Sequence, residues 1–295
     1  MTTTERRATR RALTRCDLDE LETLRWDLRR DCVDIICAGG GGHIGGDMSV
    51  IDALLVLYKR HLNMGPDMLD DPDRDRFILS KGHAMEAFYA VLAEGGYLDL
   101  DDIKARFNAY ESPYIGHPNN KLPGIEMNSG SLGHGLPVAV GMALAAKMDR
   151  RDYRTYVFMG DGELAEGSVW EGAMSAGTYR LDNLCALVDR NGLQISGRTE
   201  DVMCAEPLGD RWRSFGWNVI DVDGHDLAAL DDAFDLAART VGKPTVLIAH
   251  TIKGYGSPLM EDQAGWHHKL PSDEQHARIL TDFEAQKAET EACRG

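Results

Sequence analysis

The hydrophobic pattern of the chain contains two short apolar runs that each break abruptly into polar residues and glycine. The first run covers residues 156–159 and ends in a Gly-Asp-Gly turn at 160–162. The second covers residues 184–188 and is followed by Asn191. Such runs are typical of buried parallel strands, and the carboxyl ends of parallel strands face one crevice at the sheet edge. We therefore predict a ligand site at these two strand ends.

Apolar residues elsewhere recur mostly at helical spacing, interrupted by further short runs. Intervals of three and four residues predict helices, whereas short uninterrupted runs predict strands. We expect helices over residues 17–37, 48–61, 84–94, 136–148, 166–178 and 227–240, and a polar helix and tail from 272 to 295. We expect three more strands, the last two of them buried, over residues 77–79, 219–222 and 245–249.

This alternation of strands and helices predicts an α/β fold with a doubly wound, mostly parallel sheet flanked by helices. The main domain should cover residues 17–276, with an N-terminal tail at 1–16 and a C-terminal helix and tail at 277–295. At 295 residues and 43% hydrophobic content, the chain is long enough to bury the core of one large domain.

Charge and cysteine content narrow the classes of partner. With 32 Lys and Arg against 48 Asp and Glu, the net charge is −16, and such a surface repels nucleic acid and anionic membranes. A phosphate-bearing ligand must then be held by a local, neutralised site. The six cysteines are scattered without a CxxC pair, which favours a reduced, cytoplasmic protein. No apolar run is long enough to span a bilayer.

The two strand ends carry oxygen ligands suited to a hard divalent cation. Asp161 offers a carboxylate, Asn191 an amide oxygen, and the backbone carbonyl of Leu193 could complete one side of a Mg²⁺ or Ca²⁺ site. Mg²⁺ usually shares its coordination with phosphates, which glycines such as Gly162 and the start of the next helix would let approach the backbone. A lone Gly-Asp-Gly is most often a turn, but its combination with Asn191 is more restrictive. We predict a metal and diphosphate site.

Glycines at positions 40, 42 and 45 match the spacing of a dinucleotide-binding fingerprint. That motif needs a strand before the glycines, and here a predicted helix precedes them, so we reject this interpretation. The glycine loop contains His43 instead, a residue type that titrates near neutral pH.

The sequence around the two strand ends resembles transketolases. The segment GDGELAEGSVWEG and the later NGLQISG are similar to the thiamine-diphosphate signature, although the dipeptide before Asn191 departs from its usual paired asparagines. The resemblance implies a thiamine-diphosphate-binding fold with thiamine diphosphate and Mg²⁺ (or Ca²⁺) as cofactors. It assigns the metal to Asp161, Asn191 and Leu193. It assigns cofactor contacts to Gly162, Asn191 and Ile195.

Other segments resemble the histidine-bearing motifs of the same family. GGGGHIGGDMSVIDALLVLY implies a substrate-channel role for His43, and DRDRFILSKGHAMEAFYAVLAEGGY implies that His83 touches the cofactor diphosphate. His117, in a loop rich in Pro and Gly, resembles the third channel histidine. The closing segment HTIKGYGSPLMEDQAGWHHKLP points to His267 as a catalytic and cofactor-binding residue, with His268 as the alternative.

Two further assignments follow from the resemblance. GSLGHG is similar to the loop that contacts the cofactor rings, which assigns cofactor binding to Gly130, Ser131 and Leu132. Glu166 stands at the predicted start of the helix after Asp161, and by resemblance it belongs to the catalytic set and faces an activating glutamate of a partner.

The resemblance covers residues 17–276 but only the diphosphate-binding half of a transketolase. It implies that the chain is the N-terminal subunit of a split transketolase, which needs a separate C-terminal, pyrimidine-binding subunit in an α₂β₂ assembly. The implied reaction moves a two-carbon ketol unit from a ketose phosphate to an aldose phosphate. The cofactor supplies the carbanion chemistry, and histidines suit the proton transfers at hydroxyl groups.

Three alternatives stay open. A deoxyxylulose-phosphate-synthase-like enzyme shares the Gly-Asp-Gly signature, but the EGSVWEG helix argues against it. A 2-oxo acid dehydrogenase E1-like subunit has a compatible architecture, although the histidine set is not its pattern. A non-catalytic thiamine-binding or scaffold subunit belongs to another class, and activity with a co-purified partner would separate it from the enzymes.

Overall fold

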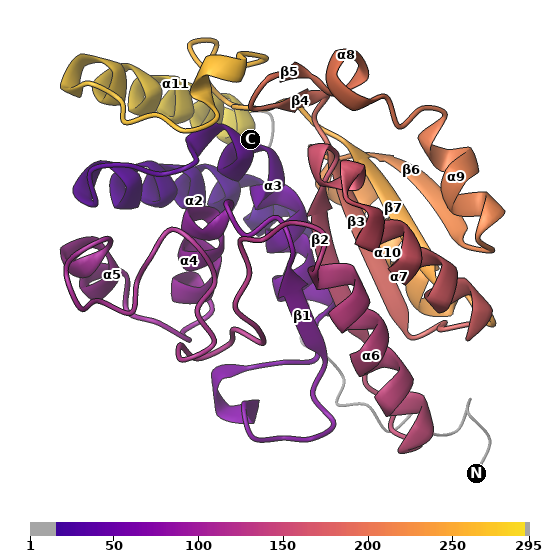
Figure 1. The fold of residues 1–295 in the computed structure, drawn as a ribbon. Coiled ribbons are helices and arrows are strands. Elements are labelled where there is room, and N and C mark those ends of the chain that lie inside the picture. The colour runs from indigo at the N-terminus through magenta and orange to yellow at the C-terminus, as the bar shows by residue number, and fades with distance from the viewer. Residues whose placement is uncertain (1–15, 293–295) are drawn as a thin grey trace.

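The computed structural model describes residues 16–292, so of the predicted N-terminal tail only Cys16 falls within the described residues. Five strands of this part form one parallel sheet, which confirms the expected α/β fold (Figure 1). In their order across the sheet, the strands are β1 (Arg76–Leu79), β2 (Thr155–Gly160), β3 (Leu184–Arg190), β7 (Thr245–His250) and β6 (Asn218–Asp223).

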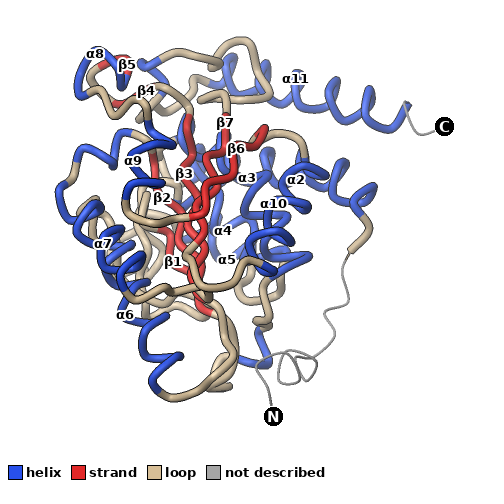
Figure 2. The backbone as a smooth tube through the Cα atoms, turned by 90° about the vertical axis from the view of Figure 1, so that its right-hand side faces the viewer, coloured by secondary structure: helices blue, strands red, loops and turns tan. Residues whose placement is uncertain are grey.

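Helices cover both faces of the sheet, as the side view in Figure 2 shows. The helices on one face are α2 (Leu18–Ala38), α3 (Ile44–Val56), α4 (Met85–Glu94) and α10 (Leu227–Arg239). Those on the other are α6 (Gly135–Met148), α7 (Gly167–Thr178) and α9 (Leu208–Ser214). The short helices are α5 (Leu100–Arg106) and α8 (Thr199–Met203), and a hairpin of β4 (Leu193–Gln194) and β5 (Gly197–Arg198) precedes α8.

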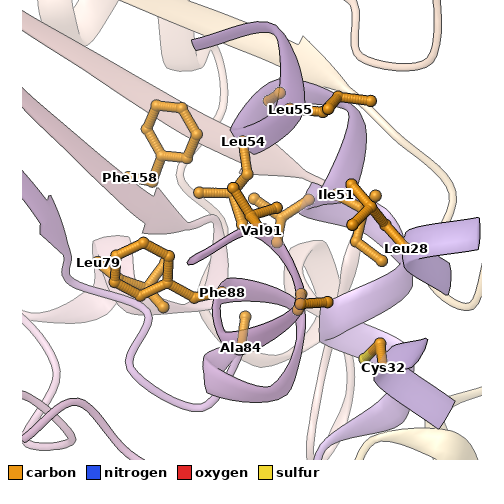
Figure 3. Packing of buried hydrophobic residues seen from close by; sticks show 14 of the residues in the cluster. Leu28, Cys32, Ile51, Leu54, Leu55, Leu79, Ala84, Phe88, Val91 and Phe158 are labelled. Carbon is orange, nitrogen blue, oxygen red and sulfur yellow. The ribbon is translucent and has the colours of Figure 1, made fainter. Parts of the chain in front are cut away.

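Alternate side chains of the central strands enter two separate cores. On β2, Tyr156 and Phe158 face the core beneath α2, α3 and α4, whereas Val157 and Met159 face the core beneath α6 and α7. Both faces of a parallel sheet are covered by helices, so an uninterrupted apolar run is what such a strand requires. Figure 3 shows Phe158 beside the packed side chains of α2, α3 and α4.

Helix α3 begins at Ile44, four residues before the predicted start at residue 48. Its first turn contains Gly45 and Gly46, which have low helix propensity and concealed the periodicity. Close packing explains the glycines, because a Cβ on Gly45 would lie 2.7 Å from the carbonyl oxygen of Trp266. The predicted helix also changes character at its end, where residues Leu57–His61 form a π-helical turn.

The prediction that residues 219–222 form a buried strand is wrong about burial. Strand β6 lies at the sheet edge and pairs only with β7, and Val222 is its one buried residue. An apolar run of this length does not distinguish an edge strand from a central one. Among the described residues, no helix combines the length and apolar composition needed to cross a membrane.

The C-terminal helix α11 (Asp273–Ala292) runs across the predicted domain end at residue 276. It packs on α2, where the rings of Phe283 and Trp26 lie 6.2 Å apart. The helix lies above the sheet in Figure 1, on the side of the β4–β5 hairpin that follows β3. The carboxyl ends of the strands therefore point toward this side of the molecule.

Candidate active site

Four neighbouring strands deliver polar residues to the same edge of the sheet. β1 leads into Ser80 and Lys81, β2 into Asp161, β3 into Asn191, and β7 into a loop that contains Lys253. The registers place these ends side by side, because β2 pairs with both β1 and β3, and β3 pairs with β7. This edge is where open α/β sheets bind ligands.

Asp161 is held by backbone donors from both strand ends. Its Oδ1 accepts the N–H of Gly162 at 2.8 Å and its Oδ2 accepts the N–H of Gly192 at 2.6 Å. Burial, with the nearby carboxylate of Asp189, raises the pKa of Asp161 to about 6. A buried carboxylate without a cation in contact is costly to ionise, so a bound cation would stabilise it.

The other two predicted metal ligands lie beside Asp161. The amide oxygen of Asn191 accepts the N–H of Leu193 at 3.1 Å, and the carbonyl oxygen of Leu193 lies 3.5 Å from Nζ of Lys253. The bond from Gly192 to Asp161 ties this segment to the end of β2. Each oxygen keeps a further lone pair, so a carboxylate, an amide and a carbonyl oxygen are available to one hard cation.

A buried ion pair lies behind this set and was not identified from the sequence. Nζ of Lys81 donates to the Asp189 carboxylate and to the carbonyl oxygen of Gly46, the latter at 2.9 Å. Asp189 also accepts hydrogen bonds from the hydroxyls of Ser49, at 2.6 Å, and Thr251. Burial alone would raise the pKa of Asp189, but Lys81 and these donors hold it below its ordinary value.

A second buried lysine, Lys253, faces the histidines. Its Nζ lies 2.9 Å from Nδ1 of His267. Burial, with repulsion from Lys81, lowers the pKa of Lys253 to about 8. The net charge of the chain predicted a local, neutralised site for phosphate, and these two lysines now provide its positive charge. Both occur in motifs quoted above, but a lysine side chain at a strand end carries no local sign of burial.

The predicted histidines converge on one cluster centred on His43. The ring centroid of His43 lies 5.7 Å from that of His83, 5.5 Å from that of His117 and 5.7 Å from that of His267. The rings of His83 and His267 lie 5.2 Å apart. These residues come from four loops that are far apart in sequence, so the fold brings together what the motifs indicated separately.

Burial keeps these imidazoles neutral. It lowers the pKa of His43 to about 4, with help from His268 and His117, and it lowers the pKa of His267 to about 3, with help from Lys253. Burial also lowers the pKa of His117, and it places that of His83 well below the ordinary range. Nδ1 of His43 is buried without a hydrogen-bond partner. Neutral imidazoles can accept protons at neutral pH.

His267 and His268 both approach the cluster but differ in exposure. His267 is half-buried and contacts Lys253 and His83, whereas His268 is exposed while its ring lies 4.8 Å from that of His43. The geometry favours His267 as the inward residue and leaves His268 at the rim.

The glycine-rich loop before α6 lies against the histidines. A Cβ on Gly130 would lie 2.8 Å from the His117 ring, and its φ of 139° also favours glycine. Ser131 in this loop is exposed and Leu132 is half-buried. Buried Glu163, also missed from the sequence, fixes the loop by accepting the N–H of Gly133 at 2.9 Å.

Two remaining predicted residues face outward. Glu166 is the exposed N-cap residue of α7, one 3₁₀ turn after Asp161. Ile195, in the β4–β5 hairpin, has 74% of its surface exposed. An apolar side chain this exposed beside a site can be covered by a ligand or a partner.

The comparisons with known proteins agree on one family. A family model described as "Transketolase, thiamine diphosphate binding domain" matches residues 23–287. One of the two apulose-4-phosphate transketolase subunits found, from Phocaeicola vulgatus, is 47% identical over 252 residues, which are 85% of this chain and 89% of that protein. The 6-deoxy-6-sulfo-D-fructose transketolase subunit SqwG of Clostridium sp. is 39% identical, over 84% of this chain and 90% of that protein.

Solved structures agree with this result. The transketolase of Campylobacter jejuni superposes with a TM-score of 0.84 and 28% identity, over 92% of this chain and 45% of that chain. The chain therefore spans less than half of that solved enzyme, whereas it spans most of the two subunit relatives.

Proposed function

The chain belongs to the transketolase family through its thiamine-diphosphate-binding domain, and from this we propose that it is the diphosphate-binding subunit of a two-chain transketolase. It would transfer a two-carbon ketol unit between sugar phosphates together with a separate C-terminal subunit. The observation that carries the proposal is the match in length: the chain spans 89% of a relative named as one subunit of a transketolase and 45% of a single-chain enzyme.

The strand-end site fits thiamine diphosphate with a divalent cation. Asp161, Asn191 and the carbonyl of Leu193 offer the hard oxygen ligands that Mg²⁺ (or Ca²⁺) prefers. Lys81 and Lys253 supply positive charge close by, which suits a diphosphate. A bound thiamine diphosphate would supply the carbanion equivalent that takes up and passes on the ketol unit.

The chain's own part in the reaction is positioning and proton transfer. The neutral imidazoles of His43, His117 and His267 can accept protons from substrate hydroxyls and return them at neutral pH. His83 lies behind them, next to Gly46, whose missing side chain leaves room for the ring. Preorganised polar groups in a half-buried channel also stabilise charge that develops on substrate oxygens.

The proposed partner would complete the site from outside. Glu166 is exposed at the start of α7, and Ile195 and Met203 are apolar side chains exposed by 74% and 62%. Exposed apolar residues beside a charged residue suit a protein interface. An α₂β₂ assembly follows if two such pairs associate. The five described cysteines are free thiols, which supports a cytoplasmic location.

The proposed substrates are sugar phosphates and related sugars. Relatives at 47% and 43% identity are named as apulose-4-phosphate transketolase subunits, and one at 39% as a 6-deoxy-6-sulfo-D-fructose transketolase subunit. Apulose 4-phosphate is therefore the donor to test first, and the sulfosugar the second. Deoxyxylulose-phosphate-synthase-like and E1-like reactions, and a non-catalytic scaffold, are the alternatives that the same assay distinguishes.

The test is co-purification of the chain with the product of the adjacent gene, followed by a ketol-transfer assay with added thiamine diphosphate and Mg²⁺. We expect transfer from apulose 4-phosphate to an aldose phosphate, and none when Asp161→Ala replaces the wild type. Pyruvate-dependent carboligation would favour the synthase-like alternative, and oxidative decarboxylation of a 2-oxo acid the E1-like one. Cofactor binding without turnover on any of these substrates would favour the scaffold.

A further inference from the structure

Two fully buried carboxyl groups, Asp47 of α3 and Glu86 of α4, lie directly behind the histidine cluster. Both side chains are 0% exposed. The groups are close enough to hydrogen-bond to each other. Three of their four oxygens nevertheless have no hydrogen-bond donor, and the fourth, Oδ1 of Asp47, accepts the N–H of Ala87 at 2.9 Å. Two ionised carboxylates cannot bond to each other, so this contact requires a proton.

No cation nearby replaces that proton among the residues that the structure describes. From α2, the thiol of Cys32 faces Asp47, and Arg29 approaches Cys32 but is already bound to Asp52. Lys81, at the end of β1, faces Asp47 but is bound to the Asp189 carboxylate. The rest of the interface among α2, α3 and α4 is apolar, as Figure 3 shows around Cys32 and Ala84.

Burial accordingly favours the protonated form of both acids. Burial raises the pKa of Glu86 well above its ordinary value, and the adjacent Asp47 raises it further. Burial also raises the pKa of Asp47. Two carboxyls in contact in a dry interior cannot both ionise near neutral pH without strong repulsion. They titrate as one coupled pair.

The pair touches the two loops that carry channel histidines. A Cβ on Gly42 would lie 2.4 Å from Oε1 of Glu86, and one on Gly116 would lie 3.7 Å from the same oxygen. These glycines immediately precede His43 and His117 in the sequence. The Glu86 carboxyl also faces the backbone N–H of His43. Asp47 in turn holds the first turn of α4 through Ala87.

We propose that Asp47 and Glu86 share one proton, and that this acid pair is a positioning device that sets where His43 and His117 stand in the channel. The role of those histidines rests on the proposed function, but the shared proton and the loop contacts do not. Loss of the proton leaves two negative charges in contact in an apolar interior. Their repulsion would push the side chains apart and loosen both histidine loops.

The pH dependence has a definite sign. A folded-state pKa raised above the unfolded value stabilises the fold at low pH, and this contribution is lost as the pH rises through the folded value. The wild-type chain should therefore lose stability between about pH 5 and about pH 9, relative to a variant in which the pair has no proton to lose.

The decisive variants change one atom group each. Glu86→Gln keeps the shape and gives Asp47 a permanent neutral donor, whereas Glu86→Ala removes the contact. Glu94→Gln, on an exposed residue of the same helix, is the matched control. Infrared spectra of the chain alone should show the carbonyl band of a protonated carboxylic acid at about pH 7 in the wild type and the control. Glu86→Gln should lack this band.

Loop order and catalysis give the second readout. Hydrogen exchange in residues 39–46 and 112–118 should be faster in Glu86→Ala but unchanged in Glu86→Gln. With its partner subunit, Glu86→Ala should lose roughly tenfold or more in kcat at unchanged cofactor affinity, and Glu86→Gln should keep wild-type kcat to higher pH.

Two results would overturn the proposal: absence of the acid band in the wild type, or equal loop exchange in the Gln and Ala variants. Both are measured on the chain alone. Failure of ketol transfer in the wild-type complex would count against the proposed function instead.

Discussion

Buried charges behind the β7 loop make Asp52 the residue whose charge contributes most clearly to stability. Its carboxylate is fully buried and accepts two hydrogen bonds from Arg29, at 2.9 and 2.7 Å. It also accepts one from Arg25 at 3.4 Å and one from Nδ1 of His225 at 2.7 Å. Burial alone would raise the pKa of Asp52, but the two arginines hold it far below its ordinary value.

Asp52→Asn keeps the shape of the side chain and removes its charge. Two guanidinium groups, at 4% and 0% exposure, would then stay buried without a counter-charge. Breaking one partner of such a buried pair costs about 3–5 kcal/mol. Asp210→Asn is the control, because Asp210 forms an exposed pair with Arg213, and such pairs contribute less than about 1 kcal/mol.

Urea unfolding of the isolated chain measures both free energies, with an unchanged m-value as the check on two-state behaviour. A depressed folded-state pKa stabilises the fold above the unfolded value and loses this contribution as the pH falls. The difference between wild type and Asp52→Asn should therefore stay constant above about pH 5 and shrink below about pH 4. A loss below about 1 kcal/mol at neutral pH would refute the assigned role of this charge.

The same variant should affect the site. Nε2 of His225 accepts the N–H of Ile252 at 2.9 Å, next to Lys253. Release of His225 from Asp52 should therefore speed hydrogen exchange in residues 251–253, and exchange there should be unchanged in Asp210→Asn.

Further predictions concern the cofactor and the histidines. Asp161→Ala should abolish cofactor-dependent turnover and keep the circular dichroism spectrum of the fold; wild-type turnover would rule out this metal ligand. His83→Ala should weaken thiamine-diphosphate binding in calorimetry, whereas His43→Ala should lower kcat by about 10²–10⁴-fold with little change in cofactor affinity. His267→Ala should lower kcat far more than His268→Ala, and the reverse order would reassign the inward position.

Local signals in the sequence were enough for the sheet and for the oxygen ligands. The apolar runs at β2 and β3 are buried on both faces, so composition alone marked them as strands. Asp161 and Asn191 follow those runs directly, and parallel pairing then places them together. The transketolase resemblance supplied the histidines, which periodicity could not assign because each lies in a loop.

Non-local packing accounts for what the sequence did not reveal. Lys81 and Asp189 lie 108 residues apart, and only the pairing of β1, β2 and β3 brings them into contact. The Asp47–Glu86 pair arises from the packing of α3 against α4, and each residue alone reads as an ordinary helix-start charge. The edge position of β6 likewise depends on strand order rather than on composition.

The most direct test of the two-chain account is a titration of the purified C-terminal subunit into this chain, with ketol transfer as the signal and saturating thiamine diphosphate and Mg²⁺. The account predicts no transfer by either chain alone and a rate that saturates at equimolar subunits. Ketol transfer by this chain alone, with no second polypeptide detectable by mass spectrometry, would contradict it.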